Sequence, residues 1–206
     1  MTAPWLRLVT LMALAIASVT ACGGQRVSAN AAAMYADAAA RDPRGKPYVI
    51  GVADVVNVSV WKDEGLSTQA VVRPDGTITM PVVGELRAAG RTASQLQQDA
   101  AQRIGTVAKD AVVTVSVVEI NSYRFTVAGN VERPGLFTSR YYVTVSEALA
   151  LAGGPNRYGS TDEIVVVRPS AGGAALYIPV NYDDILAGRN PEQDIVILAG
   201  DAIRVP

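Results

Sequence analysis

Apolar and polar residues alternate with a period of two in several short stretches of this chain, and such alternation predicts half-buried β-strands. The first stretch, residues 48–61, places Val56, Val58 and Val60 on one face and polar side chains on the other. Residues 112–118 repeat the alternation. The two stretches predict strands that open and close one module.

A β-hairpin is predicted between these strands, over residues 71–84. Pro74 presets φ, Asp75 bonds its own following backbone and Gly76 tolerates a positive φ, so the three residues reverse the chain. A further strand begins at Thr77, where apolar and polar residues alternate again. The next proline ends that strand because it has no amide donor for a sheet.

Two capping boxes predict the starts of two helices. In each box a threonine is followed three residues later by Gln or Glu, and the two side chains bond each other's backbone amides. Thr92 and Gln95 precede a helix over residues 93–104, in which apolar residues recur at helical spacing. Thr144 and Glu147 precede another, alanine-rich helix, which a Gly-Gly-Pro sequence ends.

The carboxyl-terminal half of the chain follows the order strand, hairpin, helix and further strands. Residues 164–168 and 176–180 predict two of the later strands, separated by a glycine pair, and Asp201 is expected in the turn before the last one. This order is that of a β-grasp domain. The sequence therefore predicts an α+β fold of two small modules, residues 47–120 and residues 121–206.

The amino-terminal residues are predicted to direct export and anchoring. Residues 1–21 combine an early arginine with an apolar run and small residues, which is typical of a signal peptide. The residues up to Cys22 resemble the lipobox of bacterial lipoproteins, which implies cleavage before Cys22 and its lipidation; a plain secretory signal is the alternative. Gly23 stands in place of a retention aspartate and indicates the periplasmic face of the outer membrane. Residues 22–46 are expected to be a tether, with at most a short helix in their alanine-rich part.

Composition excludes several classes of function. The chain has no histidine and one cysteine, so catalytic triads and the common zinc ligand sets cannot be assembled. We therefore expect no catalytic residue, no metal and no cofactor. Asp54, Asp63, Glu64 and Asp75 lie near predicted turns and are interpreted as solvated, because paired acids that cleave glycans need an enclosed cleft. With 18 basic and 19 acidic residues and no basic stripe, nucleic acid is not an expected partner.

Three aromatic positions are candidates for contact with a glycan ligand, because sugar-binding surfaces often use aromatic rings. Trp61 is the only tryptophan after the predicted signal peptide, and Tyr141 and Tyr142 follow Arg140 directly. Tyr123 with its neighbouring arginine is a further candidate patch. For Trp61 the alternative is that its ring caps the core of its own module. For the tyrosines the alternative is a contact between subunits, where Tyr and Arg are enriched.

Five short motifs occur in the order seen in bacterial polysaccharide export lipoproteins, and the chain resembles that family from Tyr48 to its end. The motifs are Tyr48-x-Ile50-Gly51-x-x-Asp54, Arg73-Pro74-Asp75-Gly76-Thr77, Gly129-x-Val131-x-x-Pro134-Gly135, Ala148-Leu149-Ala150-Leu151-Ala152-Gly153-Gly154 and Gly200-Asp201-x-Ile203. The amino-terminal module resembles the polysaccharide export domain. The carboxyl-terminal module resembles the soluble-ligand-binding β-grasp (SLBB) domain that commonly follows it.

The resemblance implies a lipid-anchored periplasmic ring that forms part of the passage for capsular polysaccharide or exopolysaccharide. The best-known members end in an amphipathic helix that lines an outer-membrane pore, and this chain shows no such helix. We therefore expect a separate outer-membrane β-barrel as one partner. An inner-membrane polysaccharide co-polymerase/tyrosine kinase is expected as the other.

Assembly into a ring requires a contact between unlike faces of neighbouring copies. The hairpin tip at Arg73 and Asp75 is predicted to form one face of this contact. An exposed strand edge of the carboxyl-terminal module is predicted to form the other face. The alternative function is a periplasmic lipoprotein that binds glycan or scaffolds an envelope complex without conducting polymer.

Overall fold

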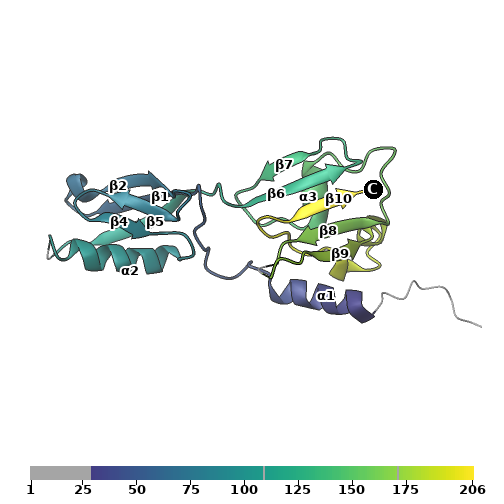
Figure 1. Ribbon diagram of the computed structural model, residues 1–206, viewed down its shortest axis with the longest axis horizontal. Helices are drawn as coiled ribbons and strands as arrows, with labels where there is room; N and C mark the ends of the chain where they lie inside the picture. Colours follow the sequence, from purple (N-terminus) through teal and green to yellow (C-terminus); the bar gives the residue numbers. More distant parts are fainter. Residues whose placement is uncertain (1–28, 109, 171) are drawn as a thin grey trace, which may run out of the picture.

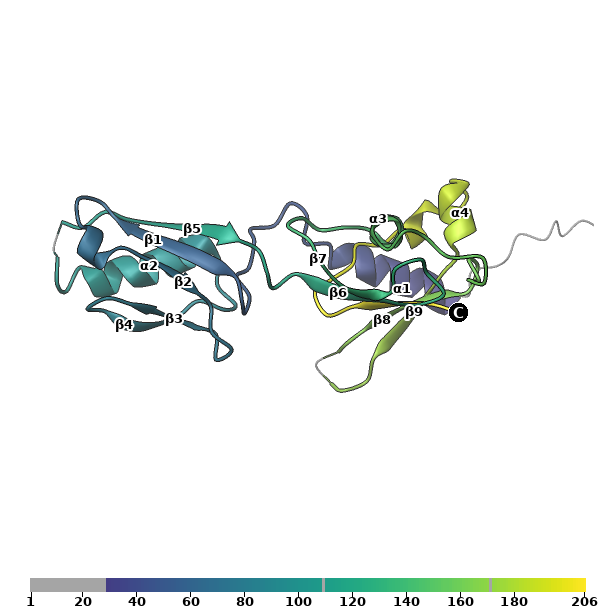
Figure 2. The ribbon, with the colours of Figure 1, turned by 90° about the horizontal axis from the view of Figure 1, so that it is seen from above.

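The computed structural model describes residues 29–108, 110–170 and 172–206, which form two α+β modules lying end to end (Figure 1). Cys22 and the predicted signal peptide lie outside the described residues. Two stretches of chain cross between the modules, one before the first strand and one after the fifth (Figure 2). The predicted α+β class and the two-module arrangement are confirmed.

The first module consists of five strands, one helix and a single 3-10 turn. Its elements are β1 (Val55–Val60), η2 (Glu64–Leu66), β2 (Thr68–Val71), β3 (Thr77–Met80), β4 (Gly84–Arg87), α2 (Ala93–Ile104) and β5 (Val113–Glu119). Strands β2, β1 and β5 form an antiparallel sheet in that order, and β3 pairs with β4 separately. The valine face of β1 is buried as predicted, and it shares its core with Leu96, Ala100 and Ile104 of α2.

The predicted hairpin is wrong in its pairing, although the turn lies at the predicted residues. The Arg73 amide donates to the Thr77 carbonyl over 2.9 Å and the Gly76 amide to the Arg73 carbonyl over 2.8 Å, so the chain does reverse there. However, β2 pairs with β1, and β3 pairs with β4 through the register of Met80 with Gly84. A period-two pattern defines which face of a strand is buried, but it does not specify which other strand pairs with it.

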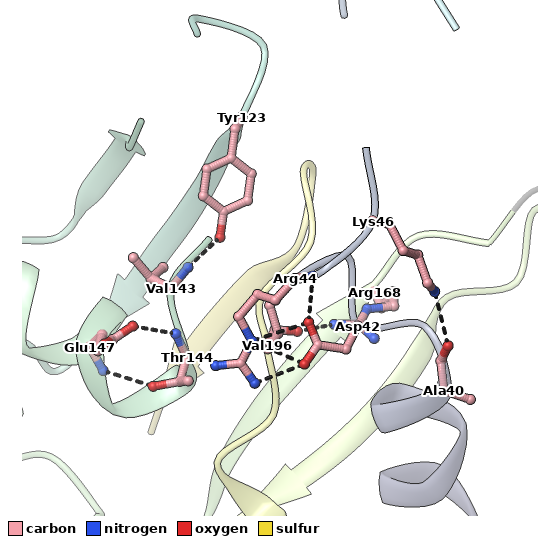
Figure 3. A network of polar contacts seen from close by, with 10 residues as sticks. All are labelled: Ala40, Asp42, Arg44, Lys46, Tyr123, Val143, Thr144, Glu147, Arg168 and Val196. Carbon is pink, nitrogen blue, oxygen red and sulfur yellow. Dashed lines mark hydrogen bonds and ion pairs between the residues drawn. The ribbon is translucent and has the colours of Figure 1, made fainter. Parts of the chain in front are cut away.

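Both predicted capping boxes are present. The Thr92 hydroxyl accepts from the Gln95 amide, and the Gln95 side chain accepts from the Thr92 amide over 2.9 Å. The same reciprocal pair joins Thr144 and Glu147, as Figure 3 shows. A helix start needs only residues within one turn, which is why these positions were predicted correctly.

The second module has a five-stranded mixed sheet covered by helices. Its elements are β6 (Arg124–Gly129), β7 (Gly135–Thr138), α3 (Val145–Leu151), β8 (Ile164–Arg168), β9 (Leu176–Val180), α4 (Tyr182–Leu186), η3 (Pro191–Gln193) and β10 (Ala202–Val205). The strand order is β7-β6-β10-β8-β9, in which only β10 and β6 run parallel. A last strand inserted between the first strand and a later hairpin is the predicted β-grasp arrangement.

The segment predicted as a tether contains a helix that packs on the second module. Helix α1 (Ala29–Ala40) buries Ala31, Tyr35 and Ala38, which recur at helical spacing on one face. The Tyr35 hydroxyl donates to the carbonyl of Pro179 in β9 over 2.6 Å. Residues 29–40 are therefore part of the second module's core and not a free tether. Within the described residues, no helix has the length and apolar character needed to cross a bilayer.

Asp201 forms the expected turn and also makes a buried ion pair that was not predicted. Its carboxylate accepts from the Leu198 amide over 2.8 Å, as a turn residue does. Arg168 lies beside it, with its Nη2 2.7 Å from Oδ2 of Asp201. The side chains of Arg168 and Asp201 are 4% and 1% exposed. A charged pair inside the module therefore links β8 to the loop before β10.

Candidate functional site

The junction between the modules is organised around the carboxylate of Asp54, whose side chain is fully buried. One oxygen, Oδ1, accepts from the amides of Asn121 and Ser122 at 2.9 and 2.8 Å. The other, Oδ2, accepts from the Gly51 amide at 2.8 Å and from the Tyr48 hydroxyl at 2.6 Å. The interpretation of Asp54 as a solvated turn residue is wrong, because its donors include amides 67 and 68 positions later in the chain.

Close backbone packing accompanies this network. A Cβ built on Gly51 would lie 2.3 Å from the Cβ of Ser122, a distance that side chains do not adopt. The hydroxyl groups of Tyr48 and Ser122 are 2.9 Å apart and hydrogen-bonded. The first module therefore meets the segment that leads into the second module at contact distance, and glycine at position 51 makes this approach possible.

A cavity of about 370 Å³ opens beside this junction. Its lining is Arg44, Tyr48, Ile120, Tyr123, Arg140, Tyr141 and Tyr142. Three chain segments contribute these residues: the stretch between α1 and β1, the stretch from β5 into β6, and the loop that leads from β7 to α3. Ligand sites commonly measure about 300–1,000 Å³ and combine aromatic walls with a few polar groups, and this cavity fits that description.

Tyr123 forms the inner wall of the cavity. Its hydroxyl donates to the Ile197 carbonyl at 2.9 Å. The same hydroxyl accepts from the Val143 amide at 3.1 Å (Figure 3). Burial raises the pKa of Tyr123 to about 12. The predicted surface patch at Tyr123 is therefore wrong: the ring is buried and its hydroxyl already has two partners.

Tyr48 and Tyr142 extend the aromatic wall towards solvent. Burial raises the pKa of Tyr48, and its hydrogen bond to the Asp54 carboxylate raises it further. Burial also raises the pKa of Tyr142, and the charge of Asp54 adds to that effect. The ring of Tyr142 packs edge-on against Tyr123 with 5.1 Å between ring centroids. Both tyrosines are consequently neutral hydroxyl groups at physiological pH.

Two arginines supply the positive charge of the cavity. Arg44 is held by Asp42 through its Nε, which is 3.1 and 3.0 Å from the two carboxylate oxygens, and its Nη2 at 2.8 Å (Figure 3). This hydrogen bonding lowers the pKa of Asp42. Arg140 is exposed and has no ion-pair partner among the described residues. Arg140 is thus the cation available to a ligand.

The predicted glycan contacts divide between two places. Tyr141 and Tyr142 lie together in the junction cavity. Trp61 is 70% exposed and lies at the far end of β1, where its amide donates to the carbonyl of Val112. The alternative that Trp61 caps the core of its module is wrong. The structure does not bring Trp61 together with the tyrosine pair. Asp54 at the junction directly precedes β1, whereas Trp61 follows the other end of that strand.

The predicted interface residues lie at an exposed turn and are already paired with each other. Arg73 forms an ion pair with Asp75, and its Nη2 is 2.9 Å from Oε1 of Glu85 on β4. Hydrogen bonds from Arg73 and Thr77 lower the pKa of Asp75. The charge at this turn is therefore partly compensated within the chain.

The sequence indicated some members of the cavity and missed others. Tyr48 belongs to the first family motif, but nothing in its local pattern predicted that it lines a cavity with residues of the second module. Arg44 lies in the segment predicted as a tether, where no local pattern indicates a ligand site. No cluster of three His, Cys, Asp or Glu side chains suited to a metal ion occurs in the described part of the chain.

Comparison with known proteins matches the two modules separately. Residues 42–118 match the family described as polysaccharide biosynthesis/export protein, and residues 124–179 match the SLBB domain. The two matches follow the order of the modules. They define the class of protein, an export-type domain followed by a ligand-binding β-grasp.

Three curated proteins illustrate the similarity. The EPS I polysaccharide export outer membrane protein EpsA of Ralstonia solanacearum is 29% identical over 188 residues, which cover 79% of this chain and 48% of that protein. The capsule polysaccharide export outer membrane protein CtrA of Neisseria meningitidis serogroup A is 25% identical, covering 75% and 43%. The polysialic acid transport protein KpsD of Escherichia coli is 31% identical, covering 69% and 25%.

The chain spans about half the length of the first of these relatives and less of the others. The chain belongs to the family of bacterial polysaccharide biosynthesis/export proteins. This family consists of polysaccharide export proteins and not of enzymes.

Proposed function

We propose that this chain is a lipid-anchored periplasmic component of a machine that exports capsular polysaccharide or exopolysaccharide. The observation that carries the proposal is the ordered match of both modules to the export and SLBB families, together with relatives named for polysaccharide export. In this role several copies enclose the passage, because one module of this size cannot surround a hydrated polymer. The outer membrane, at its periplasmic face, is the proposed location.

The proposed partners follow from this position. The ring receives polymer from an inner-membrane polysaccharide co-polymerase/tyrosine kinase and delivers it to a separate outer-membrane channel. A head-to-tail contact between unlike faces closes into a ring when its rotation permits. The exposed tip at Arg73 and Asp75 is one proposed face, and its accessible side chains support that role.

Substitution of Arg73 tests the assembly. Arg73→Gln keeps much of the length of the side chain and avoids placing a third acid beside Asp75 and Glu85. We expect a folded protein with a reduced oligomer fraction by native mass spectrometry of membrane extracts, and less polysaccharide at the cell surface. Arg91→Gln is the matched control, because Arg91 forms an exposed ion pair with Asp99 on the same module.

Two results would contradict the assembly proposal. If Arg73→Gln retains the wild-type oligomer and normal surface polysaccharide, the turn at Arg73 and Asp75 is not the interface. If the wild-type protein is monomeric in membranes that contain its partners, there is no ring.

Substitution of Cys22 tests the anchor. Several acyl chains on one residue hold a protein firmly at a membrane, whereas one chain holds it only marginally. We expect Cys22→Ser to release the protein into the soluble periplasmic fraction, as measured by fractionation and immunoblotting. Retention of the variant in membranes washed with high salt would rule out the lipid as the only attachment.

The junction cavity favours a second candidate function, a periplasmic lipoprotein that binds glycan without conducting it. Aromatic walls and free polar groups suit a sugar ligand, and neither requires a ring. Native mass spectrometry separates the two candidates: a closed oligomer supports the conduit, and a monomer that binds oligosaccharide supports the alternative.

A further inference from the structure

The junction cavity is unbalanced in charge, although the chain as a whole is close to neutral. The protein has 18 basic and 19 acidic residues, yet the cavity lining includes two arginines and no carboxylate. An acid behind the wall, Asp54, is fully buried and has four hydrogen-bond donors of its own. Its charge acts on Tyr142 in the cavity wall, but it forms no ion pair with either arginine among the described residues.

The two arginines differ in availability. Arg44 is paired with Asp42, whose hydrogen bonds raise the pKa of Arg44, so this guanidinium already has a carboxylate partner within the protein. Arg140 is exposed at the rim and is unpaired within the described residues. A planar guanidinium presents parallel N–H groups that match a carboxylate in a bidentate arrangement. Arg140 is thus positioned to bind an anion that enters the cavity.

The remaining walls suit the rest of a sugar ring. Tyr141 is 66% exposed and Tyr142 is half-buried, and neither hydroxyl has a hydrogen-bond partner in the described part of the chain. Tyrosine offers an apolar ring face together with a polar tip, so it can pack against C–H groups and hydrogen-bond hydroxyl groups of one ligand. Both features stand within one cavity with Arg140.

We propose that this cavity binds an acidic sugar residue of the exported polymer, with the sugar ring against Tyr141 and Tyr142 and its carboxylate on Arg140. This inference rests on the proposed function for the class of polymer, and it adds that the polymer carries a carboxylate. The site lies at the contact of the two modules, so a bound sugar touches residues of both: Tyr48 belongs to the first and Tyr142 to the second.

The test compares one oligosaccharide in two charge states. Full-length protein in detergent is titrated calorimetrically with a galacturonic acid oligosaccharide, and with the same oligosaccharide after its carboxyl groups have been reduced to alcohols. A hydrogen-bonded contact to a charged group predicts at least about tenfold tighter binding of the acidic form. Added salt should weaken that preference, since the contact is at the rim.

Two arginine variants test whether Arg140 causes the preference for the acidic oligosaccharide. Arg140→Gln should abolish the preference for the acidic form, while Arg124→Gln should retain it. Arg124 is the matched control because it is exposed, has no ion pair within the described residues and does not line the cavity. Tyr141→Ala should weaken the binding of both oligosaccharides by the same factor, because packing of a sugar ring against the tyrosine ring does not depend on the carboxylate.

The outcomes separate this inference from the proposed function. Equal binding of both forms, or an unchanged preference in Arg140→Gln, overturns the acidic-sugar assignment. Absence of any binding by a protein that still supports surface polysaccharide also overturns it and leaves the export role standing. A third outcome combines two measurements. If the protein binds the acidic form tightly but a strain that lacks the protein still exports polysaccharide normally, the site is supported and the export role is overturned.

Discussion

Asp54 and Asp201 are both buried carboxylates, and the two are stabilised in different ways. Asp201 lies inside the second module against the buried guanidinium of Arg168. Asp54 lies at the contact of the two modules, where its four hydrogen-bond donors are three backbone amides and one tyrosine hydroxyl. No described cation forms an ion pair with Asp54.

The difference indicates what each carboxylate does. An ion pair in a core needs two charges to be desolvated, and the loss of either leaves the other uncompensated. Amide and hydroxyl donors hold an anion without burying a second charge, and they also tie down the backbone that carries them. Asp201 therefore joins elements within one module, whereas Asp54 fixes the segment between modules.

The largest effect is expected from removing Asp201. Asp201→Ala leaves Arg168 buried and unpaired, and Nη1 of Arg168 already lacks a hydrogen-bond partner among the described residues. Breaking a buried pair in this way costs about 3 to 5 kcal/mol of the free energy of unfolding. Chemical denaturation measures the loss. The double variant Arg168→Met with Asp201→Asn should recover most of it, because no unpaired charge remains, and failure to recover would assign the effect to the turn instead of the charge.

A smaller effect is expected at the junction. Asp54→Asn keeps the shape of the side chain but turns an amide N–H₂ towards two donors, which should cost about 2 kcal/mol or more. We also expect the modules to lose their fixed relation, seen as a change in small-angle X-ray scattering while the protein stays folded. Asp201→Ala should not change the scattering of the folded protein. Asp110→Asn, an exposed acid of the first module, is the control.

If Asp54→Asn lowers stability without any change in scattering, the contrast between the two carboxylates fails. Asp54 would then be a stabilising residue of the first module only, and the orientation of the modules would depend on other contacts.

The smallest of the three expected effects is a difference in how the two carboxylate sites respond to alkaline pH, measured as a change in the free energy of unfolding. Tyr48 donates to Asp54 and has a pKa raised above its ordinary value of 10.0, whereas the donors to Asp201 are Arg168 and the Leu198 amide and include no tyrosine. The neutral hydroxyl is favoured in the folded state, so its contribution to stability is complete below pH 10 and falls as pH rises above 10. Tyr48→Phe should reduce this fall in denaturation measured from about pH 9 upwards. The part that remains is assigned to Tyr35, Tyr123 and Tyr142, because burial also raises the pKa of each of these tyrosines.

Local interactions explain which elements were predictable from the sequence. The capping boxes at Thr92 and Thr144 use donors and acceptors within one helical turn, and both were located to the residue. The buried face of β1 follows from the alternation of its own side chains. The β-grasp order of the second module is likewise a succession of local patterns, and five family motifs in register identified the class of protein.

Other features depend on partners that are distant in the chain. Whether β3 pairs with β2 or with β4 is decided by the sheet that β1 and β5 form, since each strand carries the same period-two pattern in either case. Helix α1 lies in the segment predicted as a tether, because that segment shows no strand-like alternation and the helix propensity of alanine does not indicate what a helix packs against. Only the surface of the second module, including the Pro179 carbonyl, makes its apolar face a core element.

The order of the two modules and the positions of their helix starts follow from local patterns, and the lack of histidine is read directly from the chain. Tertiary structure decided that Asp54 is buried, that Tyr123 is an inner wall, and that Arg140, Tyr141 and Tyr142 share a cavity with Tyr48. The physical reason is that burial of a carboxylate requires donors to replace water, and the amides of Asn121 and Ser122 that do so belong to a segment no local pattern connects with Asp54.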